Sequence, residues 1–234
     1  MGNIEKNLAV INNIISAAAI KSGRRFKDIK LIGVTKTVEP ERIRQLILTG
    51  ETYGADVICL GESRVQEFLP KYEALQEPLI PIWHFIGHLQ RNKVKFIIGK
   101  VSMIHSVDSL ALAQEIDKHA NQAGCIMDIL VEINIAGEDS KHGIRPEETL
   151  SFVENLMKFS NIQVRGLMCI APFVENPENN RHFFKKMRNL LLDIKAQHPH
   201  NHSLTELSMG MSGDYAVAIE EGATMVRIGT ALFG

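Results

Sequence analysis

Cysteine is scarce in this sequence, and its distribution argues against two kinds of site. Three cysteines occur among the 234 residues, at Cys59, Cys125 and Cys169, and no two of them form a Cys-x-x-Cys pair. Because their number is odd and they lie far apart in the chain, neither a disulfide framework nor a zinc site is predicted. We interpret all three as buried or inert thiols and expect no metal centre.

Long apolar runs and a charge of one sign are also missing. No stretch approaches the roughly 20 apolar residues that a membrane-spanning helix needs. The first ten residues carry Glu5 and Lys6 and no apolar run of signal length. The net charge is -1 at pH 7, with neither a long basic stripe nor an RNA-binding aromatic motif. We therefore expect a cytoplasmic protein that binds neither a membrane nor nucleic acid.

What the sequence has is a regular alternation of strand-like and helix-like patterns. Short apolar, partly β-branched runs alternate with longer segments whose apolar residues recur at helical spacing. The strand-like runs cover residues 30–35, 55–60, 82–86, 103–107, 127–135, 163–170, 204–209 and 224–228. One helix is predicted from Pro40 to a stop at Gly50, and the others cover residues 63–75, 90–98, 109–122, 147–159, 179–197 and 213–221.

Strict alternation of this kind predicts a parallel sheet, and eight repeats predict closure into a (β/α)8 TIM barrel, which typically takes about 250 residues. Residues 1–234 are predicted to be a single domain, with a barrel at residues 29–234 and an extra N-terminal helix within residues 1–23. We expect the eighth helix position to be empty, because the chain ends soon after the eighth strand. The N-terminal helix is then predicted to cover part of the barrel wall there.

Lys36 is the first candidate for chemistry. It follows the strand at residues 30–35, at the carboxyl end of a parallel strand, where α/β folds bind their ligands. Desolvation in a cleft favours the unprotonated form of an amine, and an unprotonated amine forms Schiff bases with carbonyl compounds. A sugar, a keto acid and pyridoxal phosphate are all possible partners. A solvated or salt-bridged lysine is the alternative interpretation.

Two glycine-bearing loops after the last two strands form the second candidate. Residues 208–214 are mostly small and lead into a helix, whose first N–H groups and positive dipole end favour an anion. Residues 227–230 form the neighbouring turn, and these two positions are the usual phosphate site of a TIM barrel. Pyridoxal phosphate has both a carbonyl group and a phosphate, so it fits Lys36 and these loops together. An ordinary capped helix start is the alternative.

Six sequence motifs are spread in order along nearly the whole chain, at residues 34–36, 61–67, 83–93, 165–168, 207–212 and 225–234. Together they resemble the pyridoxal phosphate homeostasis protein family, whose members are single-barrel relatives of the alanine racemase N-terminal domain. The resemblance implies a TIM barrel that binds pyridoxal 5′-phosphate and takes part in intracellular vitamin B6 homeostasis.

The resemblance also implies a cofactor site. Lys36 forms the Schiff base with the cofactor. Arg227 approaches the pyridine nitrogen, where a protonated guanidinium keeps that nitrogen unprotonated and weakens the ring as an electron sink. Ser212 and the backbone N–H groups of Gly229 and Thr230 hold the phosphate.

Further residues are implied around the cofactor. Ser208 and Met209 line the same pocket, and Met168, at the end of the sixth strand, packs on the ring, where a thioether contact is reasonable. His84 and Asn134 are weaker candidates. We expect each of these two to be structural or to act through a neighbour.

The chain departs from the family pattern at two positions. Ser63 stands where asparagine is usual, so a polar contact there is shorter or is mediated by water. His88 stands where proline is common, which loosens the turn after the third strand and leaves a titratable ring near the mouth. Residues 198–202, with the sequence His-Pro-His-Asn-His, are interpreted as a solvated loop at the far end of the barrel and not as a metal site.

Functions from different classes remain open. A carrier would hold pyridoxal phosphate without a reaction of its own and pass it on, with apo enzymes as possible recipients. A racemase needs a second base on the opposite face of the cofactor, and related racemases take it as a tyrosine from a second domain across a dimer. Tyr53, Tyr72 and Tyr215 are predicted to lie in a loop or on helices, which favours the carrier. A Schiff-base aldolase is a third possibility, and a monomer is the expected state.

Overall fold

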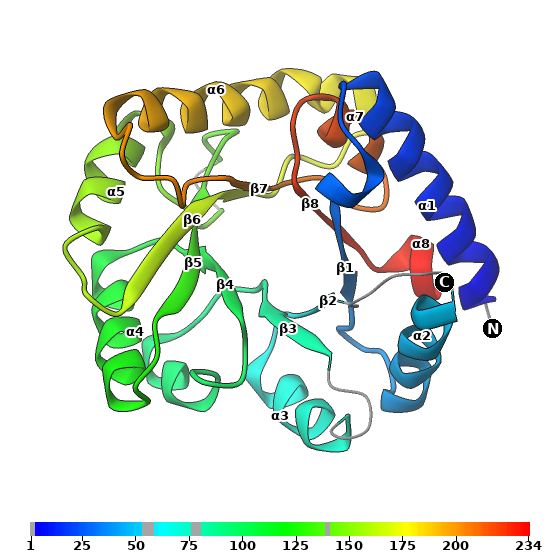
Figure 1. Cartoon of the computed structure of the whole chain (residues 1–234), viewed down its shortest axis with the longest axis horizontal. Helices are drawn as coiled ribbons and strands as arrows, with labels where there is room; N and C mark the ends of the chain where they lie inside the picture. Colours follow the sequence, from blue (N-terminus) through cyan, green and yellow to red (C-terminus); the bar gives the residue numbers. More distant parts are fainter. Residues whose placement is uncertain (1–2, 53–58, 76–80, 139–140) are drawn as a thin grey trace.

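Eight parallel strands close into a barrel in the computed structural model, which describes residues 3–52, 59–75, 81–138 and 141–234. Each strand pairs with the next along the chain, and β8 pairs with β1 to close the circle (Figure 1). This confirms the predicted TIM barrel. The strands are β1 Lys30–Val34, β2 Cys59–Glu62, β3 Ile82–Phe85, β4 Met103–Val107, β5 Met127–Ile133, β6 Ile162–Cys169, β7 Glu206–Ser208 and β8 Met225–Ile228.

Helices form a ring around the strands. The α-helices are α1 Ile4–Lys21, α2 Pro40–Thr52, α3 Val65–Ala74, α4 Leu110–Gln122, α5 Thr149–Leu156, α6 Arg181–Gln197, α7 Tyr215–Glu220 and α8 Thr230–Phe233. Four short 3-10 helices complete the described elements, at η1 Phe26–Asp28, η2 Arg91–Phe96, η3 Pro146–Glu148 and η4 Pro177–Asn180. Within the described residues, no helix combines the length and the apolar character that a membrane crossing requires.

Several details differ from the sequence-based expectations. The helix expected at residues 90–98 is the six-residue 3-10 helix η2, and Val94 is its one buried residue. Helix α2 continues through Gly50 to Thr52. The eighth helix position is not empty, because the single turn α8 occupies it. Of the predicted strand 55–60, residues 55–58 lie outside the described part of the chain.

Helix α1 packs against the barrel wall as expected. It contacts α7, α8 and α2, so it covers the region where the short α8 leaves the wall thin. Asn3 caps its first turn by accepting a hydrogen bond from the Lys6 N–H. One apolar face is buried, at Ile4, Leu8, Ile11, Ile15, Ala18 and Ala19.

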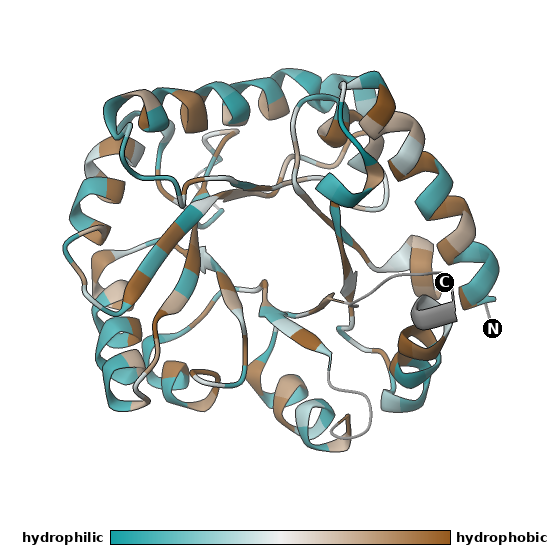
Figure 2. Ribbon diagram, in the orientation of Figure 1, coloured by the Kyte–Doolittle hydropathy of each residue, from teal (hydrophilic) through white to brown (hydrophobic). Residues whose placement is uncertain are grey.

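The core has two layers. The larger one lies between the sheet and the helices, and hydrophobic residues recur along the helices that face it (Figure 2). The smaller one fills the barrel interior and contains Ile32, Cys59, Met103, Leu130, Met168 and Met225. This inner layer packs the barrel interior, and ligand sites of this fold lie at the carboxyl ends of the strands.

Gly166 sets which residues of β6 face the interior. The pairing with β5 shifts there, because Ile129 pairs with Val164 while Leu130 pairs with Gly166. Gly166 has a φ of 155°, and a Cβ atom at this position would lie 1.9 Å from the carbonyl oxygen of Glu206. Only glycine fits such a close approach.

We predict that Ile15→Ala lowers the free energy of unfolding by about 2 to 5 kcal/mol, because it leaves a cavity where α1 meets the barrel. Ile20→Ala is the matched control, since Ile20 lies on the same helix and is 71% exposed, and we expect it to change stability by less than about 0.5 kcal/mol. Urea denaturation measures both. Equal stability of the two variants would show that α1 does not stabilise the barrel.

Candidate functional site

A cavity of about 1000 Å³ opens at the carboxyl ends of the strands. Segments at or beyond the carboxyl ends of β1, β5, β6, β7 and β8 line it, so it lies at the end of the barrel where the site was predicted. Four charged side chains of the lining are cationic, namely Lys36, Arg42, Lys141 and Arg227. Three are acidic, namely Glu39, Glu138 and Asp214. The excess of cations suits an anionic ligand.

Strand β1 delivers Lys36 to this cavity. The strand ends at Val34, Thr35 is buried, and the chain then turns so that the exposed side chain of Lys36 lines the cavity. Thr37 has a φ of 61°, a left-handed conformation that is uncommon for residues other than glycine. Its N–H donates a hydrogen bond to Oε2 of Glu67 at 3.1 Å. The Glu67 carboxylate therefore helps to hold Thr37 in a backbone conformation that is unfavourable for a threonine.

A buried ion pair holds the residue before Lys36. Nζ of Lys71 donates to Oε2 of Glu62 and to the carbonyl oxygen of Thr35, each at 2.7 Å. The Thr35 hydroxyl donates to the same carboxylate oxygen at 3.0 Å, and the Ser63 N–H donates to the other one at 2.7 Å. The side chains of Lys71 and Glu62 are only 9% and 0% exposed. The backbone directly before Lys36 is therefore held by the buried ion pair of Lys71 and Glu62.

The opposite part of the lining comes from the loops after β7 and β8. Ser212, Gly229 and Thr230 all contribute to it. The hydroxyl oxygen of Ser212 accepts a hydrogen bond from the Ala231 N–H at 3.3 Å. This contact joins the loop after β7 to the first turn of α8, so the two predicted phosphate loops form one surface.

Arg227 lines the same cavity from β8. Its Nη1 donates to the hydroxyl oxygen of Ser208 at 2.6 Å, and its Nη2 donates to the carbonyl oxygen of Cys169 at 2.8 Å. The residue is only 4% exposed, and burial lowers the pKa of its guanidinium. Two protein acceptors fix the plane of this group, so it presents its remaining N–H groups in one orientation.

Two histidines continue this network into the barrel. Nδ1 of His105 lies 3.0 Å from the Ser208 hydroxyl oxygen, and its Nε2 lies 2.8 Å from Nδ1 of His84. Burial lowers the pKa of His84 to about 3, and burial together with the nearby His84 lowers the pKa of His105 well below its ordinary value. Both rings are therefore neutral near pH 7. His84 supports Arg227 through His105 and Ser208 and does not line the cavity.

The structure places the eight predicted site residues in two groups. Met168, Ser208 and Met209 are fully buried and are not part of the lining. Side chains alternate along a strand, so Met168 lies one layer below Ile170, which does line the cavity. Met209 packs in the outer core, on the other face from its neighbour Ser208. The five that share the lining are Lys36, Ser212, Arg227, Gly229 and Thr230.

Asn134, the other weak candidate, shapes a loop at the cavity edge. Its Nδ2 donates to the carbonyl oxygen of Glu138 at 2.8 Å, and its Oδ1 accepts the Glu138 N–H at 3.1 Å. Within that loop, Nζ of Lys141 lies 2.6 Å from Oε1 of Glu138. Asn134 therefore positions two charged lining residues without lining the cavity itself.

Several buried ionisable residues had no role in the sequence-based prediction, among them Glu62, Lys71 and Glu132. Glu62 stood within a quoted motif without a role. A signal for Lys71 was present, because Phe68 and Leu75 lie three residues before and four residues after it, which puts all three on one face of the helix region. A lysine on an apolar helix face needs a buried partner. The sequence contained no comparable signal for Glu132.

Glu132 is a buried acid whose ionisation is disfavoured. It pairs with Met168 across the β5–β6 ladder and is only 8% exposed. Burial is the largest cause that raises its pKa to about 7, and the Asp108 carboxylate adds to the effect, while Arg227 opposes it. Glu132 therefore changes charge near neutral pH.

Comparison with known proteins identifies close relatives. The family of the alanine racemase N-terminal domain matches residues 4–234. A pyridoxal phosphate homeostasis protein from Aquifex aeolicus is 47% identical over 232 residues, which cover 99% of this chain and 98% of the relative. A protein of the same name from Escherichia coli is 35% identical, with 100% of this chain and 97% of the relative covered.

Solved structures extend the comparison. PipY from Synechococcus elongatus, whose structure contains bound pyridoxal phosphate, is 31% identical with a TM-score of 0.84, and the match covers 99% of this chain and all of PipY. An alanine racemase from Clostridium difficile has a TM-score of 0.69 at 18% identity, and the match covers 99% of this chain but 55% of the racemase. This second likeness shows a shared fold.

We predict that Glu132→Gln makes stability less sensitive to pH. The raised pKa means that the unfolded chain releases the Glu132 proton at lower pH than the folded chain does. The free energy of unfolding therefore falls as pH rises through the interval between the ordinary value of 4.5 and about 7, by about 2 to 3 kcal/mol between pH 5 and pH 8. Glutamine has no proton to lose, so the variant lacks this decrease.

Urea denaturation of both proteins at pH 5 and pH 8 measures this difference. Other titrating groups, including His84 and His105, affect both proteins alike and cancel in the comparison. Glu73→Gln, a change at an exposed position of α3, should leave the wild-type pH profile unaltered. Parallel profiles for wild type and Glu132→Gln would contradict the raised pKa.

Proposed function

The chain belongs to the pyridoxal phosphate homeostasis protein family, and we propose that it is a carrier that holds pyridoxal 5′-phosphate as a Schiff base on Lys36 without catalysing a reaction. The proposal rests on one observation: Lys36, Arg227 and Ser212 all line the same cavity. In this role the protein takes part in vitamin B6 homeostasis. PipY, of similar length and fold, contains the same cofactor in its structure.

The residues present fit the cofactor. Pyridoxal phosphate supplies an aldehyde carbon for an amine, and Lys36 provides the amine on a turn whose backbone is fixed. Ser212 and the N–H groups of Gly229 and Thr230 hold the phosphate on the opposite part of the lining. Arg227 faces the ring nitrogen, where its positive charge disfavours protonation of that nitrogen and so weakens the ring as an electron sink.

The buried residues of the predicted site act from behind the lining. Ser208 orients Arg227 through the hydrogen bond at 2.6 Å. Met168 and Met209 pack in the inner and outer core, respectively, and support the strand ends that carry the lining. Direct contact of Met168 with the ring remains a prediction.

The lining of the described cavity contains no tyrosine, the residue that serves as the second base in the related racemases, and this supports a carrier over a racemase. Racemisation needs an acid–base group on each face of the cofactor. Among the described residues, no tyrosine or histidine lines the cavity. Tyr72 lies in α3, Tyr215 is buried in α7, and Tyr53 lies outside the described residues. The aldolase alternative is disfavoured by family membership. Apo enzymes that need pyridoxal phosphate are the proposed recipients.

We predict that Lys36→Ala loses the covalent attachment and weakens pyridoxal phosphate binding at least about tenfold, or 1.4 kcal/mol. Residual binding persists because the phosphate loops are intact. The measurement combines an absorbance titration with borohydride reduction and mass mapping. In the wild type, the yellow band collapses on reduction and the adduct maps to Lys36.

Lys141→Ala is the matched control, since Lys141 also lines the cavity but is paired with Glu138. This variant should keep the yellow band and the adduct on Lys36. Equal affinity of wild type and Lys36→Ala, or an adduct that maps to Lys141, would refute the role assigned to Lys36.

We also predict that the loaded protein does not exchange the Cα proton of amino acids. Incubation of the holoprotein with L-alanine in heavy water, followed by NMR and chiral chromatography, should show neither deuterium at Cα nor D-alanine. An alanine racemase assayed in parallel provides the positive control. Exchange that disappears in Lys36→Ala would replace the carrier with the racemase alternative.

A further inference from the structure

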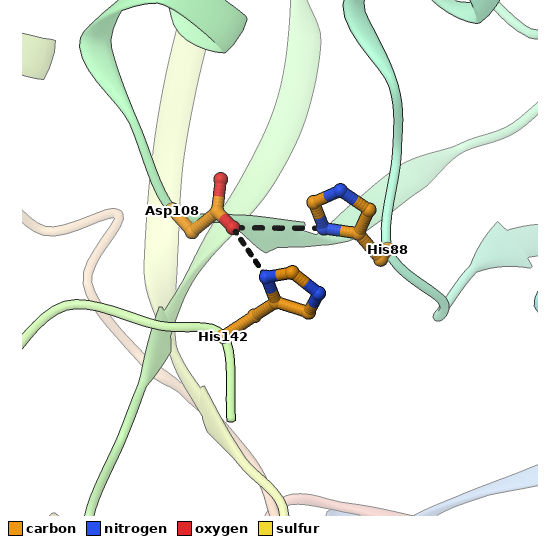
Figure 3. A group of neighbouring side chains, drawn as sticks. All are labelled: His88, Asp108 and His142. Carbon is orange, nitrogen blue, oxygen red and sulfur yellow. Dashed lines mark ion pairs between the residues drawn. The ribbon is translucent and has the colours of Figure 1, made fainter. Parts of the chain in front are cut away.

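A second cluster of chemically reactive side chains lies at the same end of the barrel as the cavity. It consists of His88, Asp108 and His142 (Figure 3). His88 follows β3, Asp108 follows β4 and His142 lies in the segment after β5. Three separate loops therefore bring two imidazoles and one carboxylate together. Of these residues, only His88 stood out in the sequence, as a departure from the family pattern.

The three groups are arranged around one point. Nδ1 of His88 lies 3.6 Å from Oδ2 of Asp108, and Nδ1 of His142 lies 3.9 Å from the same oxygen. One potential ligand atom from each residue lies within 4.8 Å of the other two. Figure 3 shows both Nδ1 atoms turned toward the carboxylate. Both N···O distances exceed the 2.7 to about 3.2 Å of a protein hydrogen bond, so the side chains converge without bonding directly to one another.

These separations are close to those of a tetrahedral metal site. Zinc bonds of about 2.0 to 2.1 Å to nitrogen and oxygen place neighbouring ligand atoms about 3.3 to 3.4 Å apart. Movements of less than about 1 Å would bring the three atoms to bonding distance. His88 and His142 are partly exposed, at 43% and 58% of their side chains, so both rings have room to adjust by rotation. Asp108 is the most buried of the three, at 14%.

The rings of His88 and His142 are stacked, so at least one of them must rotate before both Nδ1 atoms can point at the same ion. The rings of His88 and His142 lie 3.9 Å apart between centroids and only 13° from parallel. Two imidazolium rings in this arrangement would repel each other, and a single carboxylate cannot hydrogen-bond both at the observed distances. Two neutral imidazoles and one carboxylate are instead a common ligand set for zinc and for other divalent transition metals.

We propose that His88, Asp108 and His142 bind one divalent transition-metal ion of the zinc class. Three protein ligands leave at least one coordination position of a tetrahedral ion for water or another small ligand. A groove of about 670 Å³ borders the site and is lined by His88 and Asp108 together with Gln90, Asn92 and Glu115. The open position thus has access to solvent.

The metal site adjoins the cavity through one segment of chain. His142 directly follows Lys141, which lines the cavity with Glu138. An ion bound to His142 therefore ties this edge of the cavity to the loops after β3 and β4. The ion restrains the segment whether or not the cavity holds a ligand, so the site is independent of the proposed carrier function.

The test is a calorimetric titration of Zn²⁺ into the full-length chain, purified without a histidine tag and freed of metal and pyridoxal phosphate. We expect one ion per chain. Co²⁺ should give visible absorption bands with the intensity of a tetrahedral site. His88→Ala and His142→Ala should each lower Zn²⁺ affinity by more than about 100-fold, because loss of a partner that only supports a ligand already costs about 10- to 100-fold.

Two controls separate this site from other histidines. His119→Ala changes an α4 histidine outside the proposed site, and the triple variant His198→Ala, His200→Ala, His202→Ala removes the histidine-rich loop before β7. Both variants should bind Zn²⁺ like the wild type. The proposal fails if the wild type binds no zinc, if His88→Ala and His142→Ala bind it normally, or if binding is lost with the triple variant. Circular dichroism of each variant verifies that its fold is intact.

Discussion

The buried pair of Glu62 and Lys71 is the interaction on which the site depends most directly. Lys71 donates to the carbonyl oxygen of Thr35 and to the Glu62 carboxylate at the same time, so a paired charge fixes the last peptide before Lys36. Breaking a buried ion pair typically costs about 3 to 5 kcal/mol, because one charge remains without a partner. Because the backbone before Lys36 is fixed, its side chain enters the cavity from one defined position, which restricts the orientations of its amine.

Barrel closure supplies the second constraint. Ile32 of β1 pairs with Arg227 of β8, so the chain just beyond each strand reaches the same end of the barrel at neighbouring positions. Lys36 follows one strand, and Gly229 and Thr230 follow the other. The amine and the phosphate loops are thus adjacent because of the fold, although about 190 residues separate them in the sequence. The methionine-rich interior layer supports this arrangement from below.

The sequence predicted what depends on local patterns and chain order. Alternating strand and helix patterns predicted the barrel, the strand ends predicted Lys36 and the two glycine-bearing loops, and the family resemblance added Ser212, Arg227, Gly229 and Thr230. The sequence did not show which layer of the barrel each side chain occupies. Adjacent residues such as Ser208 and Met209 cannot both face the interior. Contacts between distant segments, such as Glu62 with Lys71, appear only after folding.

The environment of Arg227 is the part of the site that bears most directly on the proposed carrier function. Ser208 and the Cys169 carbonyl accept hydrogen bonds from its guanidinium. The two histidines behind Ser208 remain neutral near pH 7, so Arg227 is the cation of this hydrogen-bond network. A cation opposite the ring nitrogen opposes its protonation, and an unprotonated ring accepts carbanion charge poorly. In the proposed carrier, the same residue would thus bind the cofactor and suppress its chemistry. Because Lys36 is exposed at the cavity, a cofactor attached there as proposed would be accessible for transfer.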